Sequence, residues 1–586
     1  MKKITILIIV ISFIVCSGFI LAQTIINVDP GSGTLNQAIT TNGSATYVLK
    51  AGGWYGLTAI IQVNTPMSIV GETPAAGQMP AIIQTGTTPS GTTFSNMINQ
   101  TANLTIKNVF IVNADLNDAV GAYFIGQIAS CTLVIDSITA DPMGTYFLVT
   151  QGDHVNDYIT NSLFMRQGNM LTISDGNTFG KWGHKWDTLY VENNTFVNIG
   201  TALYTPGDWS VSKEQFQWIN HNTMLFAKAN GMGGLYADQV FFSNNLCWLF
   251  DFHPCLVAWR AYGADANAPK AKYGSLIGAD TAYVDTIAGV PILETLPSSR
   301  KFFVEYNSNY RTKALWDLLA WGNANVPSQT SYFLPFVWGQ DYKDSSREAT
   351  MFSDHVNFPY FKANNNIDDM WAENKAHDPQ FINSKIYTLT DSAVAWVTSS
   401  SRQIWGLAAG NPANWTKYFY DVDGNNGNPT TWPRFNGAYS NTQFLTGSIE
   451  KLPLGDLNWF PDKKAIWEKN KTAIMAHILS ENESQMDLTS VNQENNQTPT
   501  VFSLSQNYPN PFNPSTVIKY SIPQSGFVTL KVYNLLGQEV VTLVNQEQKT
   551  GNYNVNFDAS KLASGVYMYR IQAGDFSLTK KMTLLK

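Results

Sequence analysis

Charged side chains are scarce in this chain. Only 14% of its 586 residues are Asp, Glu, Lys or Arg, and the formal net charge is −7. No run of Lys and Arg forms the basic stripe with which proteins neutralise the phosphates of DNA or RNA. We therefore exclude nucleic acid as a partner.

Cysteine is also rare, with four residues in the whole chain. No set of Cys and His has the spacing of a structural zinc site. Cys247 and Cys255 are eight positions apart, a spacing that would close a small loop in an oxidising compartment. Cys131 is then expected to be unpaired and buried.

Long apolar runs are missing except at the N-terminus. Lys2 and Lys3 precede the apolar stretch from Ile4 to Val15, and small or polar residues follow it. This pattern predicts a cleaved signal peptide over residues 1–23, because the apolar run ends before the roughly 20 residues that a spanning helix needs. We expect no transmembrane segment in the mature chain.

A short pattern returns along the middle of the chain: an apolar residue, a second residue, and then usually Asn. It occurs at Ile106-Lys-Asn108, Ile135-Asp-Ser137, Ile159-Thr-Asn161, Val191-Glu-Asn193, Ile219-Asn-His221, Phe242-Ser-Asn244 and Val304-Glu-Tyr306. The apolar anchors are 29, 24, 32, 28, 23 and 62 residues apart, so the last gap has the size of two or three units with an insertion. This period, in residues that favour strands, predicts the coils of a parallel β-solenoid with inward anchors and a bend at the Asn position.

The segment before these repeats resembles the first coils of the pectate-lyase-like, right-handed β-helix superfamily. The resemblance rests on Ile26-Asn-Val-Asp-Pro-Gly31, Thr34-Leu-Asn-Gln-Ala-Ile39, Tyr47-Val-Leu-Lys-Ala-Gly-Gly-Trp-Tyr55 and Met67-Ser-Ile-Val-Gly71. It implies a helix around Leu35 to Ile39 that caps the open end of the core. We predict a parallel β-helix over residues 24–480.

Residues 311 to about 480 are rich in Trp and do not repeat cleanly. We expect a few more coils with long loops, including Asp378-Pro-Gln-Phe381, and a closing helix at Asp462 to Leu479. Ile466, Trp467, Ala473, Ile474 and Ile478 are predicted to share its apolar face. A separate domain in this region is the alternative.

The last part of the chain is predicted to be a small immunoglobulin-like β-sandwich over residues 501–586, after a polar linker over 481–500. Its Tyr508-Pro-Asn-Pro-Phe-Asn-Pro514, Tyr533-Asn-Leu-Leu-Gly-Gln-Glu539, Leu562-Ala-Ser-Gly-Val-Tyr567 and Lys580-Lys-Met-Thr-Leu-Leu-Lys586 resemble type A sorting domains of type IX secretion. The resemblance implies export across the outer membrane by the type IX machinery, to the extracellular space or the cell surface. The fold class is thus all-β, a solenoid followed by a sandwich.

The residues before five successive anchors are aromatic and are predicted to face outward. We call this set the aromatic file: Tyr158, Tyr190, Trp218, Phe241 and Phe303. Sugar rings stack on such side chains, so the aromatic file is a candidate polysaccharide-binding surface. In the alternative, the Trp-rich chain after residue 310 folds over the aromatic file and buries it.

A second candidate site lies in and after Lys181-Trp-Gly-His-Lys-Trp-Asp187. The superfamily resemblance implies a lyase that removes the proton beside a uronate carboxylate with a basic residue, together with a cation that is often calcium. Lys185, Asp187 and Glu192 are the candidate catalytic residues, and an exposed loop is the alternative. Asp421, Asp423 and Asn425 resemble the start of a calcium loop, although the closing Glu is missing and a plain turn is the alternative.

Two classes of function follow. The first is a secreted polysaccharide-degrading enzyme, a lyase before a hydrolase. The second is a non-catalytic glycan-binding, adhesive or structural protein of the cell surface. The strand motif Asn-Lys-Ser of related lyases and the Asp pairs of polygalacturonases are absent, which favours the second class, whereas the superfamily resemblance favours the first.

Overall fold

The chain is known from a computed structural model and divides into two compact units, Met1–Met486 and Asp487–Lys586. The structure describes residues 24–117, 119–142, 144, 146–166, 177–182, 186–199, 201–207, 214–227, 237–248, 283–287, 290–294, 301–310, 365–369, 375–388, 435–486, 488, 502–507, 510, 512, 514–534, 538–574 and 576–584. No helix in these ranges is long and apolar enough to cross a membrane.

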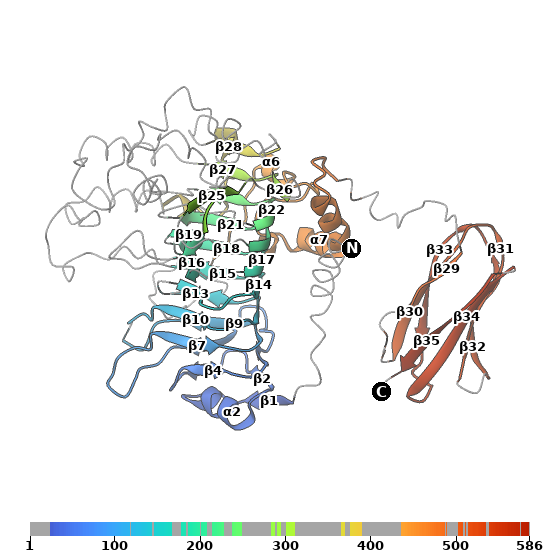
Figure 1. Ribbon diagram of the computed structural model, residues 1–586, viewed down its shortest axis with the longest axis horizontal. Coiled ribbons are helices and arrows are strands. Elements are labelled where there is room, and N and C mark those ends of the chain that lie inside the picture. The colour runs from blue at the N-terminus through green and yellow to red at the C-terminus, as the bar shows by residue number, and fades with distance from the viewer. Residues whose placement is uncertain are drawn as a thin grey trace. The chain divides into compact units, whose positions relative to one another are not determined.

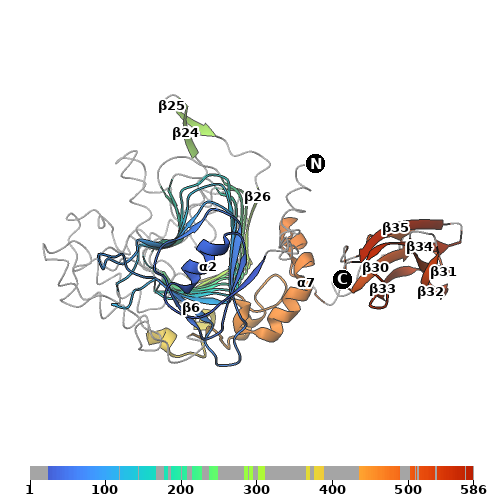
Figure 2. The same cartoon turned by 90° about the horizontal axis from the view of Figure 1, so that it is seen from below.

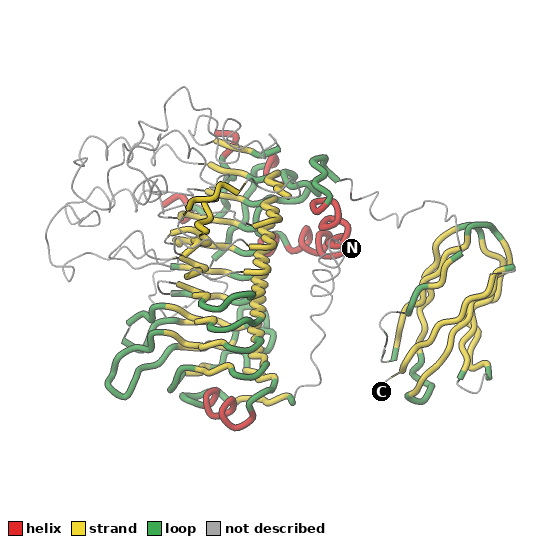
Figure 3. Tube along the Cα trace, viewed as in Figure 1, coloured by secondary structure: helices red, strands yellow, loops and turns green. Residues whose placement is uncertain are grey.

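The first unit is a parallel β-helix in which three sheets run side by side along the stack (Figures 1 and 3). Sheet A consists of β1 (Ile25–Val28), β2 (Thr46–Leu49), β5 (Met67–Gly71), β8 (Leu104–Lys107), β11 (Thr132–Asp136), β14 (Val155–Thr160), β17 (Trp186–Glu192), β20 (Glu214–Asn220), β22 (Ala237–Ser243) and β26 (Lys301–Glu305). Sheet B consists of β3 (Trp54–Gly56), β6 (Ala81–Gln84), β9 (Val109–Val112), β12 (Thr139–Ala140), β15 (Leu163–Met165), β18 (Thr195–Ile199), β21 (Thr223–Ala227), β23 (Leu246–Trp248), β27 (Ser308–Tyr310) and β28 (Ile367–Asp369). Sheet C consists of β4 (Ile61–Val63), β7 (Asn96–Gln100), β10 (Tyr123–Gln127), β13 (Tyr146–Thr150), β16 (Asn177–Trp182) and β19 (Thr201–Gly207).

The predicted anchors stand in register along sheet A. Ile106, Ile135 and Ile159 pair in succession, and the series continues through Val191 and Ile219 to Phe242 and Val304. All of these anchors are buried in one apolar core. The prediction of a solenoid with inward anchors is therefore confirmed.

The bend after each anchor is left-handed. The third residue of every repeat has a positive φ between 53° and 58°, in the set Asn108, Ser137, Asn161, Asn193, His221, Asn244 and Tyr306. Asn and His adopt this conformation more readily than most residues, which explains why the repeat favours Asn here. This bend turns the chain from sheet A into sheet B.

A ladder of buried Asn side chains stacks inside the bends. Asn222 Oδ1 accepts from the backbone N–H of Asn194 at 3.1 Å, and Asn222 Nδ2 donates to Val191 O at 2.9 Å. The same contacts recur up the stack at Asn245, Asn307 and Asn366. The ladder thus satisfies backbone groups that the bend leaves without strand partners.

The lower end of the core is closed by α2 (Thr34–Asn42), which lies across the opening of the coils (Figure 2). Leu35 and Ile39 are buried against the first coils, so the predicted capping helix is confirmed. Higher in the stack the core is filled by aromatic rings, with Phe164 lying 4.8 Å from Phe147 and 5.0 Å from Phe196 between centroids.

The gap between Phe242 and Val304 holds one coil, because β22 pairs directly with β26. The expected two or three units are therefore wrong. The extra length includes the antiparallel hairpin of β24 (Tyr283–Ile287) and β25 (Val290–Glu294), and residues 249–282 lie outside the described residues.

After residue 310, β28 adds one more strand to sheet B, and the 3-10 helix η2 (Lys375–His377) follows. Phe381 of the predicted Asp-Pro-Gln-Phe segment packs against Trp248, with centroids 5.7 Å apart. Further elements are α6 (Thr442–Leu445), η4 (Leu457–Trp459) and α7 (Pro461–Leu479).

The closing helix is confirmed as α7. Trp467, Ile474 and Ile478 are buried as predicted, whereas Ile466 is 39% exposed. Asn470 and Met475 complete the buried face. We call residues 448–486, which include η4 and α7, the cover segment. Its last residues were expected in the linker, but Glu483 O accepts from Tyr306 Oη at 2.6 Å in the first unit.

The second unit is an antiparallel sandwich, as predicted. One sheet holds β29 (Ser503–Leu504), β30 (Ser515–Ile522) and β33 (Gly551–Asp558). The other holds β32 (Glu539–Gln548), β31 (Gly526–Tyr533), β34 (Gly565–Ala573) and β35 (Phe576–Leu584). Alternate residues such as Val528, Leu530 and Val532 point into its core.

We predict that Asn222→Ala lowers the free energy of unfolding of the β-helix by about 2–5 kcal/mol, because it leaves several buried backbone groups without partners. Denaturant unfolding followed by Trp fluorescence measures this unit alone, since every Trp precedes residue 487. Asn42→Ala is the control, because Asn42 is exposed on α2. Equal unfolding curves for the two variants would contradict a stabilising ladder.

Candidate functional site

The aromatic file exists in the predicted register but lies in the interior. Tyr158 pairs with Tyr190, Tyr190 with Trp218, and the series continues to Phe241 and Phe303. Trp218 is 0% exposed, and its ring stacks on Tyr190 with centroids 6.0 Å apart. The structure shows the alternative, in which the later chain folds over the aromatic file. Lys471 of α7 lies over the Tyr190 ring, with Nζ 5.5 Å from the ring centroid. A sugar-stacking role stays a prediction and would require the cover segment to leave sheet A.

Glu192 is buried beneath α7 and pairs with Lys471. Its other oxygen accepts from Trp218 Nε1 at 2.9 Å and from Asn220 Nδ2 at 3.1 Å. Burial works against the charged carboxylate, but Lys471 and these donors hold the pKa of Glu192 below its ordinary value of 4.5. Burial also raises the pKa of Tyr190 well above 10.0, so its hydroxyl stays protonated and donates to Glu192.

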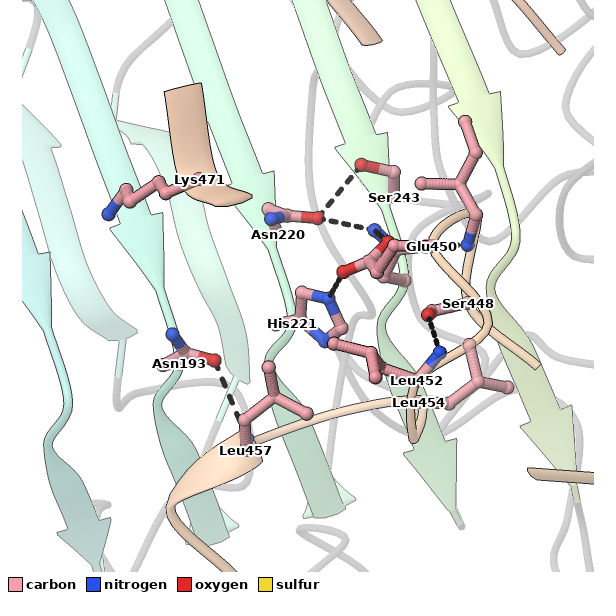
Figure 4. A network of polar contacts seen from close by, with 12 residues as sticks. Asn193, Asn220, His221, Ser243, Ser448, Glu450, Leu452, Leu454, Leu457 and Lys471 are labelled. Atoms are coloured by element: carbon pink, nitrogen blue, oxygen red, sulfur yellow. Dashed lines mark hydrogen bonds and ion pairs between the residues drawn. The ribbon is translucent and has the colours of Figure 1, made fainter. Parts of the chain in front are cut away.

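A second buried pair joins His221 to Glu450 (Figure 4). His221 Nε2 faces the Glu450 carboxylate, and His221 Nδ1 faces the carbonyl oxygen of Gly455 at 3.0 Å. Both ring nitrogens face acceptors, so both carry protons and the ring is an imidazolium. Burial alone would lower the pKa of His221, but Glu450 and the carbonyl raise it above 6.5.

The left-handed bend residues of sheet A hold the cover segment. Asn193 Oδ1 accepts from the backbone N–H of Leu457 at 3.4 Å, and Asn244 Oδ1 accepts from that of Ile449 at 2.9 Å. Gly455 approaches so closely that a Cβ atom there would lie 2.3 Å from Thr223 Oγ1. The buried ion pairs and the bend residues thus hold the cover segment against sheet A.

Two further carboxyls, those of Asp157 and Asp456, are buried. Burial raises the pKa of Asp157 to about 7, although Gln127 and Trp186 donate hydrogen bonds to it. Burial likewise raises the pKa of Asp456 to about 7, where Thr195 Oγ1 donates to it at 2.7 Å. Both carboxyls lie in packed interior, so we assign them to the structure of the β-helix.

An exposed polar cluster lies at the corner where sheet C turns into sheet A. His154 Nδ1 is 3.0 Å from Asp187 Oδ1, and Gln215 Nε2 donates to the same oxygen at 2.7 Å. The side chains of His154 and Asp187 are 59% and 27% exposed. These three residues come from three successive coils. Of the predicted catalytic residues that the structure describes, Asp187 is partly exposed here and Glu192 is buried.

The outer face of sheet C carries a second polar set, which we call the amide–tyrosine strip: Gln62, Asn99 and Tyr123, together with the buried Asn96. Asn99 donates to Gln62 Oε1 at 3.3 Å, and Asn96 donates to Asn99 Oδ1 at 2.7 Å. The Tyr123 ring lies against Gly126, where a Cβ atom would be 3.0 Å from the ring. Gln62 is exposed, and Asn99 and Tyr123 are partly exposed.

The structure separates the predicted catalytic residues. Asp187 and Glu192 lie at opposite ends of β17, with Cα atoms roughly 16 Å apart at the usual rise per residue of a strand. A hydrolytic carboxylate pair needs about 5–9.5 Å between the carboxyl groups. Lys185 lies outside the described residues.

The predicted calcium ligands Asp421, Asp423 and Asn425 also lie outside the described residues. Within the described ranges, no group of three or more His, Cys, Asp or Glu side chains could hold a metal ion. Cys131 and Cys247 are buried, and Cys255 is not among the residues described.

Sequence reasoning missed His154, the Asn ladder and the partners of the cover segment. The ladder had a local signal, because an Asn follows the bend residue in Asn193-Asn194, His221-Asn222, Asn244-Asn245 and Tyr306-Asn307. His154 had none, since its partner Asp187 is 33 positions away.

Comparison with known proteins identifies the C-terminal domain. Residues 506–584 match the family described as the secretion system C-terminal sorting domain. The chain is therefore exported by type IX secretion to the cell surface or the extracellular space. No curated protein matches the chain.

Among solved structures, a PL6 family alginate lyase aligns with 16% identity and a TM-score of 0.25. The alignment covers 39% of this chain and 36% of that chain. A likeness of this size carries no inference about activity.

We predict that the two ion pairs of His221 and Glu192 together hold the cover segment most tightly between about pH 4.5 and 6.5. The contribution of His221 is fully present below its unfolded pKa and is lost as the pH rises through its raised folded pKa. The contribution of Glu192 is present above its unfolded pKa and is lost as the pH falls. This pH dependence is measured as the protection of residues 448–457 against hydrogen–deuterium exchange. It is compared at about pH 6 and pH 9, with α2 as the internal reference.

In Glu450→Gln the protection of residues 448–457 should fall at about pH 6, by about 3 kcal/mol, because the buried imidazolium loses its counter-charge. His477→Gln is the control, since His477 lies on an exposed part of α7. Protection that is independent of pH in the wild type would contradict the charged pair.

Proposed function

We propose that this exported β-helix protein acts on polysaccharide, and that the polymer lies on the outer face of sheet C and reaches the corner between sheets C and A. The cover segment closes sheet A from β17 to β26, so a long ligand has no access to those strands. Gln62, Asn99 and Tyr123 of the amide–tyrosine strip and the corner with His154 are at least partly open to solvent. Export outside the cell agrees with a polymeric substrate that cannot enter it.

The amide–tyrosine strip carries the proposal. Amide groups can both donate to and accept from sugar hydroxyls, and a tyrosine ring offers an apolar face to the C–H side of a sugar. The strip extends over β4, β7 and β10, whose neighbouring strands are about 4.8 Å apart. Its polar atoms therefore repeat along the stack, as an extended polymer requires.

A lyase is favoured over a hydrolase. Asp187 and Glu192 are too far apart for hydrolysis by a carboxylate pair, and Glu192 is engaged by Lys471. Removal of a proton beside a uronate carboxylate needs one positioned base, and the exposed corner can supply it.

The rival proposal is a glycan-binding protein without catalysis, which is favoured by the missing lyase motifs. Calcium stays a prediction that rests on the loop with Asp421.

Turnover separates these proposals. We expect the full chain to depolymerise at least one polymer in a panel of uronate and neutral polysaccharides, with the ultraviolet absorbance of an unsaturated uronide. New reducing ends without this absorbance would indicate a hydrolase, and binding without cleavage would indicate the rival proposal. Neither binding nor cleavage across the panel would refute an action on polysaccharide, and parallel runs with a chelator test calcium.

We predict that Tyr123→Ala weakens binding of the polymer about tenfold, because the stacking ring is lost. Affinity measured by calorimetry with the full chain is the test. Phe527→Ala is the matched control, since Phe527 is 51% exposed on the sorting domain. An unchanged dissociation constant for Tyr123→Ala would place the polymer elsewhere.

A further inference from the structure

The exposed pair of His154 and Asp187 has features that packing alone does not explain. Asp187 occupies a bulge, because Val155 pairs with Trp186 while the next residue, Asn156, pairs with Thr188. Trp186 is fully buried, and its indole Nε1 donates to Asp157 at 2.5 Å. This anchor fixes the start of β17, so the extra residue is directed outward toward the corner.

His154 stands in a left-handed conformation with φ 59°. His adopts this region more readily than most side chains, as His221 does at the bends between sheets A and B. The conformation brings the imidazole of one coil over the carboxylate of the next. Bulge and bend together therefore create a contact between residues of two coils.

The contact determines which ring nitrogen carries the proton. Nδ1 of His154 faces the carboxylate of Asp187, so the neutral ring places its hydrogen on Nδ1 and its lone pair on Nε2. Gln215 donates to the same carboxylate oxygen and holds it in place from the third coil. No group in the described part of the chain bonds Nε2, which belongs to a 59% exposed side chain.

We propose that His154 is the general base of the lyase reaction and that Asp187 is its positioning residue. This proposal rests on the proposed function and deepens it by naming the base. Nε2 takes the proton from the carbon beside the uronate carboxylate, and the electrons of that C–H bond form the C4–C5 double bond. The C4–O4 glycosidic bond breaks, and O4 receives the proton from the imidazolium. The imidazole is restored, so atoms and charge balance without another reactant.

The sharpest test is His154→Asn. The Asn side chain keeps a donor at the place of Nδ1 and tolerates the left-handed backbone, but it has no group at the place of Nε2. We expect turnover to fall at least about 10²-fold while the dissociation constant of the polymer is unchanged. His477→Asn, at an exposed histidine of α7, should cleave like the wild type.

Asp187→Asn tests the positioning role. It should lower kcat at least about tenfold with little change in KM, because the ring loses its orientation but the polymer still binds. In His154→Gly, added free imidazole should restore part of the turnover, which a merely structural residue would not show.

The outcomes distinguish the two levels of the proposal. Cleavage by His154→Asn at the wild-type rate would overturn the base assignment and leave the lyase intact. Loss of binding together with turnover would also overturn it, since His154 would then only shape the surface. A wild type that binds the polymer but never cleaves it would refute the lyase itself, and the base assignment with it.

Discussion

The left-handed bend between sheets A and B is the constraint on which the β-helix depends. At each bend one residue takes a positive φ, and from the bend at Asn193 onward the next residue directs an Asn side chain inward. The inward amides join the coils to one another, while outward side chains such as His221 and Asn244 hold the cover segment. One backbone conformation thus serves both the stacking of the coils and the closure of sheet A.

The closure of sheet A decides where a ligand can bind. Glu192 and His221 are charged groups in the interior, and each is balanced by a partner from the cover segment, Lys471 or Glu450. Desolvation of these charges is costly unless both partners stay in place. The aromatic file is therefore held under α7 by polar contacts as well as by apolar packing. Among the described residues, partly exposed polar side chains remain on sheet C and at the corner with His154.

Much of the fold could be predicted because its signals are local or periodic. The anchors, the capping helix around Leu35, the helix α7 and the strands of the sorting domain each follow from short patterns. The site could be predicted only in part. Asp187 was predicted together with Glu192 as a candidate catalytic residue. The carboxylate of Glu192 is buried and is neutralised by Lys471, which lies 279 positions away in the sequence. Ile466 was assigned to the buried face of α7, but the direction of approach of the helix left it exposed.

The sequence alone determined the period of the coils, the inward position of the anchors and the sorting signal, because each depends on residues close together in the chain. Tertiary structure alone decided which outward residues stay exposed. Trp218 and Tyr123 are both aromatic residues on outer faces of strands, yet one is covered by α7 and the other is partly exposed. The contact of His154 with Asp187 was likewise decided by the stacking of two coils. Neither burial nor contact between distant segments has a local pattern, because both depend on how the coils and the cover segment pack.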